Sequence, residues 1–556
     1  RLQGKIKEHA SQASSGGGFH DSWSAHQLQQ SYLLGPSEAA EKISKGAHCP
    51  SNAPVKKYNV TAINVEITLN QWGDYYPGYM YVLDENIDQV RKDEKINAKA
   101  REDENDPGTI SNGLQGDVIQ PLVLRANQGD CVRIHFTNQV EDEDAGFQVN
   151  GSAMIISSSG LPASAASKGA ITASGESQDF EWMIPIDEQE GSHMIMSHAG
   201  RDPSSLGLTG VMVVEPKGSR YLDPWTSKPM KSGWEAMIVN DEERDFREFT
   251  IVYHEVGDES FRPLNRFSEM IPQRDPMTDS YRPSARAINM RSEPFGINNL
   301  AQQDKRFHFE DESLAYSSYT FGDAPTTIPR SYLGDPAKYR LVHGGGEVFH
   351  SHHPHGGTIR WTRSPKRESQ QLENLTTAAY NGPVKYPVIR TTTDRVDVQV
   401  IGPSEVMDLE TECGSGLCQR LAGDFLFHCH VAHHYVAGMW GYWRVYNTLQ
   451  NGNYPFGSTD TMRPLAELPD RKGRIPQGVS SDKLVGKTMD WFGTKFRIVS
   501  KGKSDWTKET RVVNIKDWVK YMLPPQGRPG HTDDEKGQIM SYDGSVWDYA
   551  WKGNQA

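Results

Sequence analysis

Two short histidine-rich windows place the strongest constraint on how this chain can fold. Eight of its 19 histidines lie within residues 348–357 and 425–439. The second window also holds Cys429 and Met439, so it combines imidazole, thiol and thioether groups. Apolar residues precede the first histidine of each window, as they do where a β-strand ends. Because the windows lie far apart in the sequence, a fold that uses both must bring two strand ends together.

Hydrophobic alternation predicts strands through most of the chain. Asn59–Leu69 alternates apolar and polar residues, which is typical of a half-buried strand. Further strands are predicted at Val118–Arg125, Asp130–Thr137, Ser177–Ile184, His193–Met196 and Gly210–Val214. A second β block opens at Arg247–Glu255 and closes at Met439–Tyr446. The 51 glycines and 32 prolines fit a turn-rich protein, so we predict an all-β chain.

The 556 residues divide into four expected parts, which span 1–56, 57–218, 246–448 and 449–556. The first is a polar N-terminal arm, and the last is an irregular C-terminal extension that wraps the β core. The two middle parts are β domains, and the second carries an irregular insertion near 258–299. The charged stretch Gln89–Pro107 is predicted to be a solvated surface insertion.

Charge and hydropathy exclude two classes of partner. The formal net charge of −13 repels phosphate backbones, so we expect no nucleic acid partner. No run of about 18 consecutive apolar residues occurs, so we expect no membrane span.

Five cysteines indicate the cellular compartment. An odd number suggests two disulfides and one thiol kept for chemistry. Cys413 and Cys418 flank a short turn that suits a local disulfide, which leaves Cys49 and Cys131 as the other possible pair. The alternative is that all five are reduced. We also interpret a chain that begins at Arg1 as processed, and we expect an extracytoplasmic location, whether periplasmic, cell-surface or secreted.

The donor set of the two windows points to copper. Cys429, His434 and Met439 come from one strand and the loop after it, whereas His350 comes from the other window. Two histidines and one cysteine form a trigonal copper plane, with methionine as a weak axial ligand. His352 and His433 are expected to face away from the metal, and the glycine run 344–346 to let the backbone approach it. The alternatives are a structural zinc site, a tract that binds stray metal, and ordinary histidines.

At these residues the chain resembles the multicopper oxidases of the cupredoxin superfamily. His428, Cys429, His430, His434 and Met439 match that family's fourth copper motif. His350, His353 and His355 match its third, with Ser351 where the family usually has proline. The resemblance covers 59–215 and 247–446 and implies two cupredoxin-like Greek-key β-barrel domains. It also implies that His350, Cys429, His434 and Met439 hold a type 1 copper.

The first two motifs of that family are incomplete here. Its trinuclear copper cluster needs eight histidines, but Gln148, Asn150 and Met196 occupy three of those positions. By the resemblance, His198, His355 and His428 would still hold one three-histidine copper. His353 and His430 are residual positions of the two other cluster coppers. The alternative is a polar cleft without metal.

Spacing favours two domains over the three of some family members. The stretch of about 150 residues between His198 and His350 holds an insertion but no further complete domain. In two-domain relatives the interdomain copper forms between neighbouring chains, generally in a homotrimer. His198 would then come from one chain, and His355 and His428 from the next.

The resulting expectation is a copper-dependent oxidoreductase of multicopper-oxidase type. An external electron donor, whether a small molecule, a metal ion or a protein, reduces the type 1 copper, which passes electrons to the interdomain copper. The missing ligands count against four-electron reduction of oxygen. The alternatives are a mononuclear copper reductase resembling nitrite reductase, and a non-catalytic copper protein for electron transfer or assembly. No catalytic residue can be assigned from the sequence.

Overall fold

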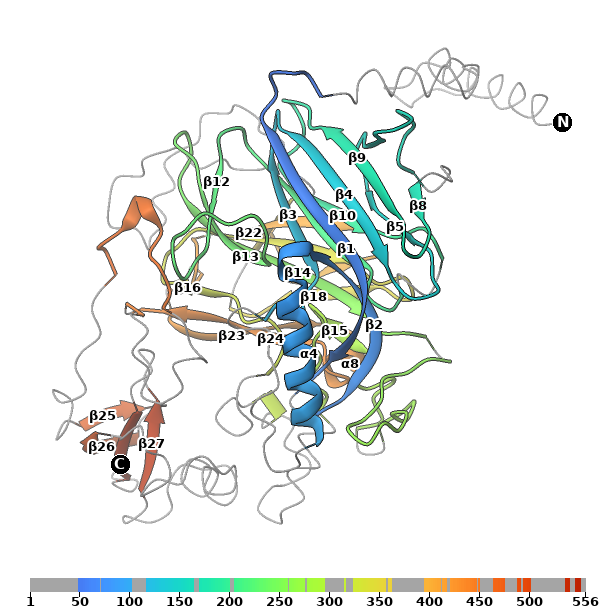
Figure 1. The fold of residues 1–556 in the computed structure, drawn as a ribbon. Helices are drawn as coiled ribbons and strands as arrows, with labels where there is room; N and C mark the ends of the chain where they lie inside the picture. Colours follow the sequence, from blue (N-terminus) through green and yellow to red (C-terminus); the bar gives the residue numbers. More distant parts are fainter. Residues whose placement is uncertain are drawn as a thin grey trace, which may run out of the picture.

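The computed structural model describes most of the region between residues 49 and 475 and four later strands. The described residues are 49–70, 72–102, 117–164, 170–200, 205–258, 260–275, 278–295, 315–316, 324–356, 359–362, 395–411, 413–417, 421–447, 449–450, 464–475, 488–491, 494–501, 536–540 and 546–551. Nearly all of the predicted N-terminal arm therefore lies outside the described residues. The predicted all-β fold is confirmed (Figure 1).

The first β unit consists of two facing sheets. One sheet has the order β2 (Tyr75–Leu83), β1 (Val55–Thr68), β4 (Cys131–Gln139), β9 (Ser177–Met183), β7 (Ile155–Ile156). The other has the order β3 (Leu122–Asn127), β11 (Thr209–Glu215), β10 (Gly191–Met196), β6 (Gln148–Val149). Two short strands, β5 (Ala145–Gly146) and β8 (Ile171–Thr172), pair separately. The core between the sheets contains Phe136, Phe147, Phe180 and Trp182, since alternate residues of these strands point inward.

The second β unit also has two main sheets. The larger follows the order β12 (Arg220–Leu222), β13 (Glu235–Val239), β14 (Phe246–Glu255), β17 (Ala337–His343), β22 (Val406–Thr411), β19 (Ile359–Thr362), β20 (Arg395–Val396), with β15 (Arg286–Ile288) paired to β14. The smaller follows β16 (Arg330–Tyr332), β24 (Trp440–Tyr446), β23 (Gly423–Cys429), β18 (His350–Pro354), β21 (Gln399–Ile401).

The two units repeat one pairing pattern. β1 runs parallel to β4 and antiparallel pairing joins β4 to β9, just as β14 runs parallel to β17 and β17 pairs antiparallel with β22. In the other sheets, β3–β11–β10–β6 corresponds to β16–β24–β23–β18, again with one parallel pair followed by two antiparallel pairs. The two β blocks are thus similar folds, and β6 and β10 occupy the positions that β18 and β23 occupy in the second unit.

The two units share an apolar and ionic interface. Val123, Met194 and Val211 of the first unit belong to the same buried cluster as Phe249 and Leu341 of the second. Beside this cluster lies Arg340 on β17, whose side chain is fully buried. Its guanidinium contacts four carboxylates, those of Glu190, Glu215, Glu248 and Asp408. The first two carboxylates belong to the first unit and the last two to the second, so one arginine connects both.

Two segments carry more regular structure than the sequence indicated. The charged stretch after residue 86 forms helix α4 (Ile87–Glu102), which follows the short helix η1 (Asp84–Asn86). Val90 and Ala100 of α4 are buried, and Arg101 donates a hydrogen bond to Thr68 at the end of β1. The C-terminal extension contains a four-stranded sheet, in the order β25 (Thr488–Trp491), β26 (Thr494–Lys501), β28 (Val546–Trp551), β27 (Lys536–Met540). Two further short helices are α8 (Ala432–Val436) and η5 (Pro469–Arg471).

The cysteines pair as the spacing predicted, as far as the described residues show. Cys49 and Cys131 form a disulfide. Cys413 is also disulfide-bonded, and its predicted partner Cys418 lies outside the described residues. Within the described part of the chain, Cys429 is the free cysteine, and it is buried. In the same part, no helix is long and apolar enough to span a membrane.

Candidate metal centre

Pairing of β18 with β23 brings the two histidine-rich windows together. The antiparallel register places His352 opposite Cys429 and His353 opposite His428. After β23 the chain turns through α8, and the backbone N–H of Met439 donates to the carbonyl of His434 at 3.0 Å. The backbone N–H of Cys429 in turn donates to the carbonyl of Met439 at 3.1 Å. The loop therefore returns His434 and Met439 to the strand end that carries Cys429.

Three donor atoms converge at this strand end. Cys429 Sγ lies 3.4 Å from His434 Nδ1 and 3.8 Å from His350 Nδ1, and the two nitrogens are 3.2 Å apart. All three side chains are buried. Met439 is also fully buried and belongs to the same apolar cluster as Cys429. The group therefore presents one sulfur and two imidazole nitrogens to a common point in a dry environment.

Burial sets the protonation of these groups. Desolvation lowers the pKa of His350 to about 4 and that of His434 to about 3. Desolvation also raises the pKa of the Cys429 thiol to about 11, although the backbone N–H groups of Ser351 and Val431 and the charge of Arg286 favour the thiolate. Neutral imidazoles keep a lone pair for a metal, and a bound cation would displace the thiol proton. The donor atoms of His350, Cys429 and His434 thus fit a copper ion.

A buried carboxylate supports His350 from behind. Glu255, the last residue of β14, places Oε1 2.8 Å from His350 Nε2. The backbone N–H groups of Gly346 and Val348 also donate to this carboxylate. Burial opposes the charge of Glu255, but His350, His343 and Arg286 outweigh it and hold the pKa of Glu255 well below its usual range.

A carboxylate at this distance favours a proton on Nε2 of His350. That tautomer would leave the lone pair on Nδ1, which lies 3.8 Å from the Cys429 sulfur. The sequence reasoning missed Glu255, because a single acid at the end of a buried strand follows no recognisable motif.

Within the glycine run at 344–346, Gly345 packs against this carboxylate, and the expected approach of the backbone to a metal stays a prediction. A Cβ on Gly345 would lie 1.8 Å from Glu255 Oε2. A Cβ on Gly346 would have no heavy atom within 4 Å. Of these two positions, only Gly345 leaves no room for a side chain above Glu255.

Gly345→Ala is therefore expected to destabilise the protein by about 1–3 kcal/mol, since the added methyl displaces a buried, hydrogen-bonded carboxylate. Gly346→Ala is the matched control and should change the free energy of unfolding by less than about 0.5 kcal/mol. Urea unfolding of the two variants beside the parent measures the difference. Equal stabilities would show that Glu255 does not depend on the missing Cβ.

A second imidazole cluster lies on the other side of the same strands. His428 Nε2 lies 3.3 Å from His353 Nδ1 and 3.0 Å from His355 Nε2. The His430 ring centroid is 4.8 Å from that of His353. Burial lowers the pKa of His428 to about 4 and lowers the pKa of His353 and His355 as well, so these rings are neutral near pH 7. His428 is bonded through the backbone to Cys429, so the two clusters are adjacent along the chain.

The matching strands of the first unit carry no such cluster. Met196 on β10 lies opposite Gln148 on β6, and the Asn150 amide donates to Met196 Sδ at 3.0 Å. Gln148 Oε1 is buried without a hydrogen-bond partner. His198 is exposed, and it does not join His353, His355 and His428 in the group of imidazoles that the described residues form.

Two further histidines of the windows lie outside both clusters, as predicted. His352 Nδ1 is 2.7 Å from the hydroxyl of Tyr253, on the side of the core. His433 is exposed on α8.

Comparisons with known proteins find similarity in structure only. No family model matches the chain, and no curated protein matches its sequence. A multicopper oxidase structure is 15% identical with a TM-score of 0.39, and the match covers 72% of this chain and 92% of that chain. A copper nitrite reductase from Nitrosomonas europaea is 12% identical with a TM-score of 0.38, covering 71% of this chain and 94% of that chain. A blue copper oxidase from the same organism is 13% identical with a TM-score of 0.38, and the match covers 77% of this chain and 98% of that chain.

Proposed function

We propose that this protein is a copper-dependent oxidoreductase in which His350, Cys429, His434 and Met439 hold a type 1 copper. The observation that carries this proposal is the convergence of Cys429 Sγ with the Nδ1 atoms of His350 and His434 in a buried pocket. A bound copper there supplies one-electron exchange. The strands and α8 hold the donor atoms in place beforehand, so little rearrangement accompanies a change of charge.

The second part of the proposal is an acceptor site that begins at His428. Because His428 follows directly on Cys429, the polypeptide itself provides a short covalent path from the sulfur to the second cluster. His355 contacts His428, and His353 and His430 lie beside it. We propose that His355 and His428 hold one copper together with His198 from a neighbouring copy of the chain. The exposure of His198 and its absence from the cluster within one chain support a contribution from a second copy, as in a homotrimer.

Four-electron reduction of oxygen has less support than transfer of single electrons. Amide and thioether groups at Gln148, Asn150 and Met196 are weaker ligands for oxidised copper than imidazole, and Asn150 and Met196 already bond each other. The electron donor stays unassigned. An extracytoplasmic location is part of the proposal and is supported by the disulfide between Cys49 and Cys131.

Copper content per chain, measured on protein loaded with copper and freed of excess metal, tests the proposal. Two ions per chain, with a trimeric mass in solution, would agree with it. One ion per chain would favour a non-catalytic electron carrier, and four would contradict the assignment of Gln148, Asn150 and Met196 as lost ligand positions. Absence of bound copper would overturn the proposal altogether.

A further inference from the structure

A cavity away from the copper clusters lies where the first unit meets the β12–β13 hairpin. It has a volume of about 210 Å³ and is lined by β2, by residues 117–122 and by the segment from Asp223 to Glu235. No residue of β18, β23 or α8 lines it. The cavity is therefore separate from the proposed copper sites, and no inference about copper is needed to interpret it.

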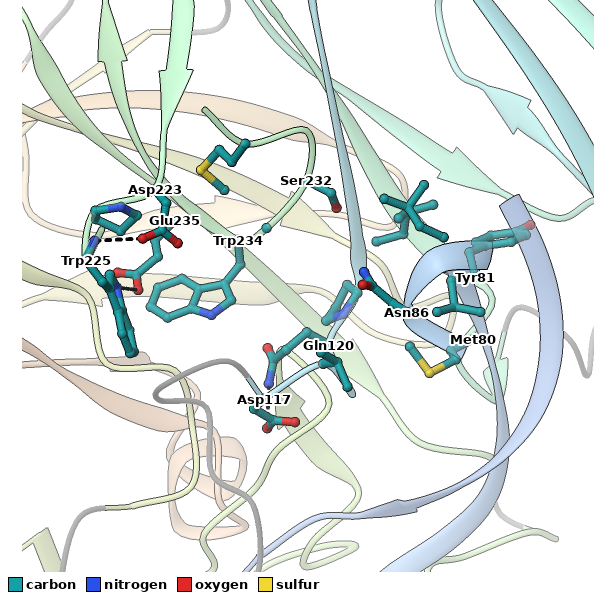
Figure 2. A pocket seen from close by; sticks show the side chains of 18 residues that line it. Met80, Tyr81, Asn86, Asp117, Gln120, Asp223, Trp225, Ser232, Trp234 and Glu235 are labelled. Atoms are coloured by element: carbon teal, nitrogen blue, oxygen red, sulfur yellow. Dashed lines mark hydrogen bonds between the residues drawn. The ribbon is translucent and has the colours of Figure 1, made fainter. Parts of the chain in front are cut away.

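The walls of the cavity combine aromatic rings with hydrogen-bond acceptors. Figure 2 shows the Trp234 indole between Trp225 and Glu235 on one side and Gln120 on the other. Trp225 and Trp234 are each less than 10% exposed, and Met80 and Met230 complete the apolar part of the lining. Aromatic walls together with convergent polar groups are common in small-molecule sites.

All charged side chains that the structure describes in the lining of the cavity are acidic. Its titratable carboxyl groups belong to Asp117, Asp223 and Glu235, and no lysine, arginine or histidine occurs among the described residues that line the cavity. Asp117 is paired with Arg291 at 2.6 Å, and Asp223 accepts hydrogen bonds from the backbone N–H groups of Trp225 and Thr226. Glu235 has one carboxylate oxygen that is buried without a hydrogen-bond partner.

Two acceptor oxygens in the lining are buried without a partner. Glu235 Oε1 accepts a hydrogen bond from Trp225 Nε1, whereas Glu235 Oε2 has no partner. The Gln120 amide nitrogen donates to Asp117, whereas Gln120 Oε1 has no partner. Both side chains are 7% exposed. Buried acceptors of this kind are costly unless a donor reaches them, so they indicate a missing hydrogen-bond donor.

From this lining we propose that the cavity binds a small organic ammonium ion. Its N–H groups would satisfy the free oxygens of Glu235 and Gln120, and its positive charge would lie beside the Trp234 ring, where a cation is attracted by the negative face of the indole. The apolar part of the ligand would pack against Met80 and Met230. Burial raises the pKa of Glu235 to about 7, although Arg330, the Trp225 hydrogen bond and Arg247 oppose the rise, so a bound cation would further stabilise the charged form of this carboxyl group.

Titration calorimetry on the full chain with three ligands of one shape tests the charge requirement without any mutation. The ligands are phenethylammonium, the neutral 2-phenylethanol and the anionic phenylacetate. Phenethylammonium is expected to bind, and the two others at least about tenfold more weakly. Equal binding of the neutral and cationic ligands, or no binding of phenethylammonium up to about 10 mM, would overturn the proposal.

Two variants locate the bound ligand. Glu235→Gln keeps the shape of the side chain and should weaken phenethylammonium binding about tenfold or more, since it removes the unpaired carboxylate oxygen. Glu242→Gln, which changes an exposed acid beyond the same hairpin, is the control and should bind as the parent does. Equal affinities of the two variants would place the ligand elsewhere. If Glu235→Gln does not fold, the affinity of Trp234→Leu for phenethylammonium is measured instead. Weaker binding than in the parent would place the ligand in this cavity, and unchanged binding would place it elsewhere.

Discussion

Cys429→Ser is expected to abolish the intense visible absorption of the copper-loaded protein and to remove the ion bound at the strand end. The absorption of a type 1 site arises from the bond between thiolate and copper, and a serine hydroxyl does not form such a bond. Cys429 is fully buried and its Sγ accepts the backbone N–H of Ser351 at 3.3 Å, so the smaller serine fits the same space. Absorption spectra and copper content of parent and variant measure the effect.

A matched pair on α8 controls for damage to the loop. His434→Ala removes a proposed ligand whose Nδ1 lies 3.4 Å from the sulfur, whereas His433→Ala changes its exposed neighbour. The first should lose the absorption band and the second should keep it. Persistence of the band in Cys429→Ser, or its loss in both histidine variants, would contradict the assignment of the type 1 ligands.

Arg340→Met is expected to destabilise the protein by about 3–5 kcal/mol, because it removes the cation that four buried carboxylates share. Arg125 and Lys338 would be the remaining cations, and they contact only Glu248 and Glu190. Glu215 would then lie buried without the arginine that it pairs with, and burial already raises the pKa of Glu215 and of Asp408 above the usual range. The loss should appear as a lower urea midpoint in tryptophan fluorescence.

A surface ion pair provides the comparison. Arg220 forms two hydrogen bonds with Asp241 beside the β12–β13 hairpin, where more than half of each side chain is exposed. Arg220→Met is expected to cost no more than about 1 kcal/mol, since exposed pairs are screened by water. Similar losses in Arg340→Met and Arg220→Met would show that the buried network does not hold the two units together.

Strand positions and the ligand windows could be read directly from the sequence. The alternation in Asn59–Leu69 anticipates β1, and the apolar run before His428 anticipates β23. Both signals are local, because side chains of a strand alternate between two faces with a period of two residues. Donor chemistry is local as well, so Cys429, His434 and Met439 could be grouped without knowledge of the fold.

Helix α4 adds regular structure that the sequence did not predict. Its charged side chains are mostly exposed or half-buried, in agreement with a solvated surface insertion, but the charge density gives no sign of a helix. Lysine, glutamate, alanine and arginine are also strong helix formers, so the segment becomes a helix when a few apolar residues such as Val90 find a buried place beside β1.

The amino-acid sequence by itself determined the all-β class and the kinds of donor atoms available for a metal, and it offered Cys49 and Cys131 as one possible disulfide. Only the tertiary structure decided that Glu255 lies behind His350, that Arg340 joins the carboxylates of both units, and that His198 stays apart from His355 and His428 within one chain. The physical reason is the separation in sequence between the residues that interact. Strand alternation and ligand type depend on neighbouring residues, whereas a buried carboxylate, a shared guanidinium or an unfilled acceptor depends on which distant strands pack together.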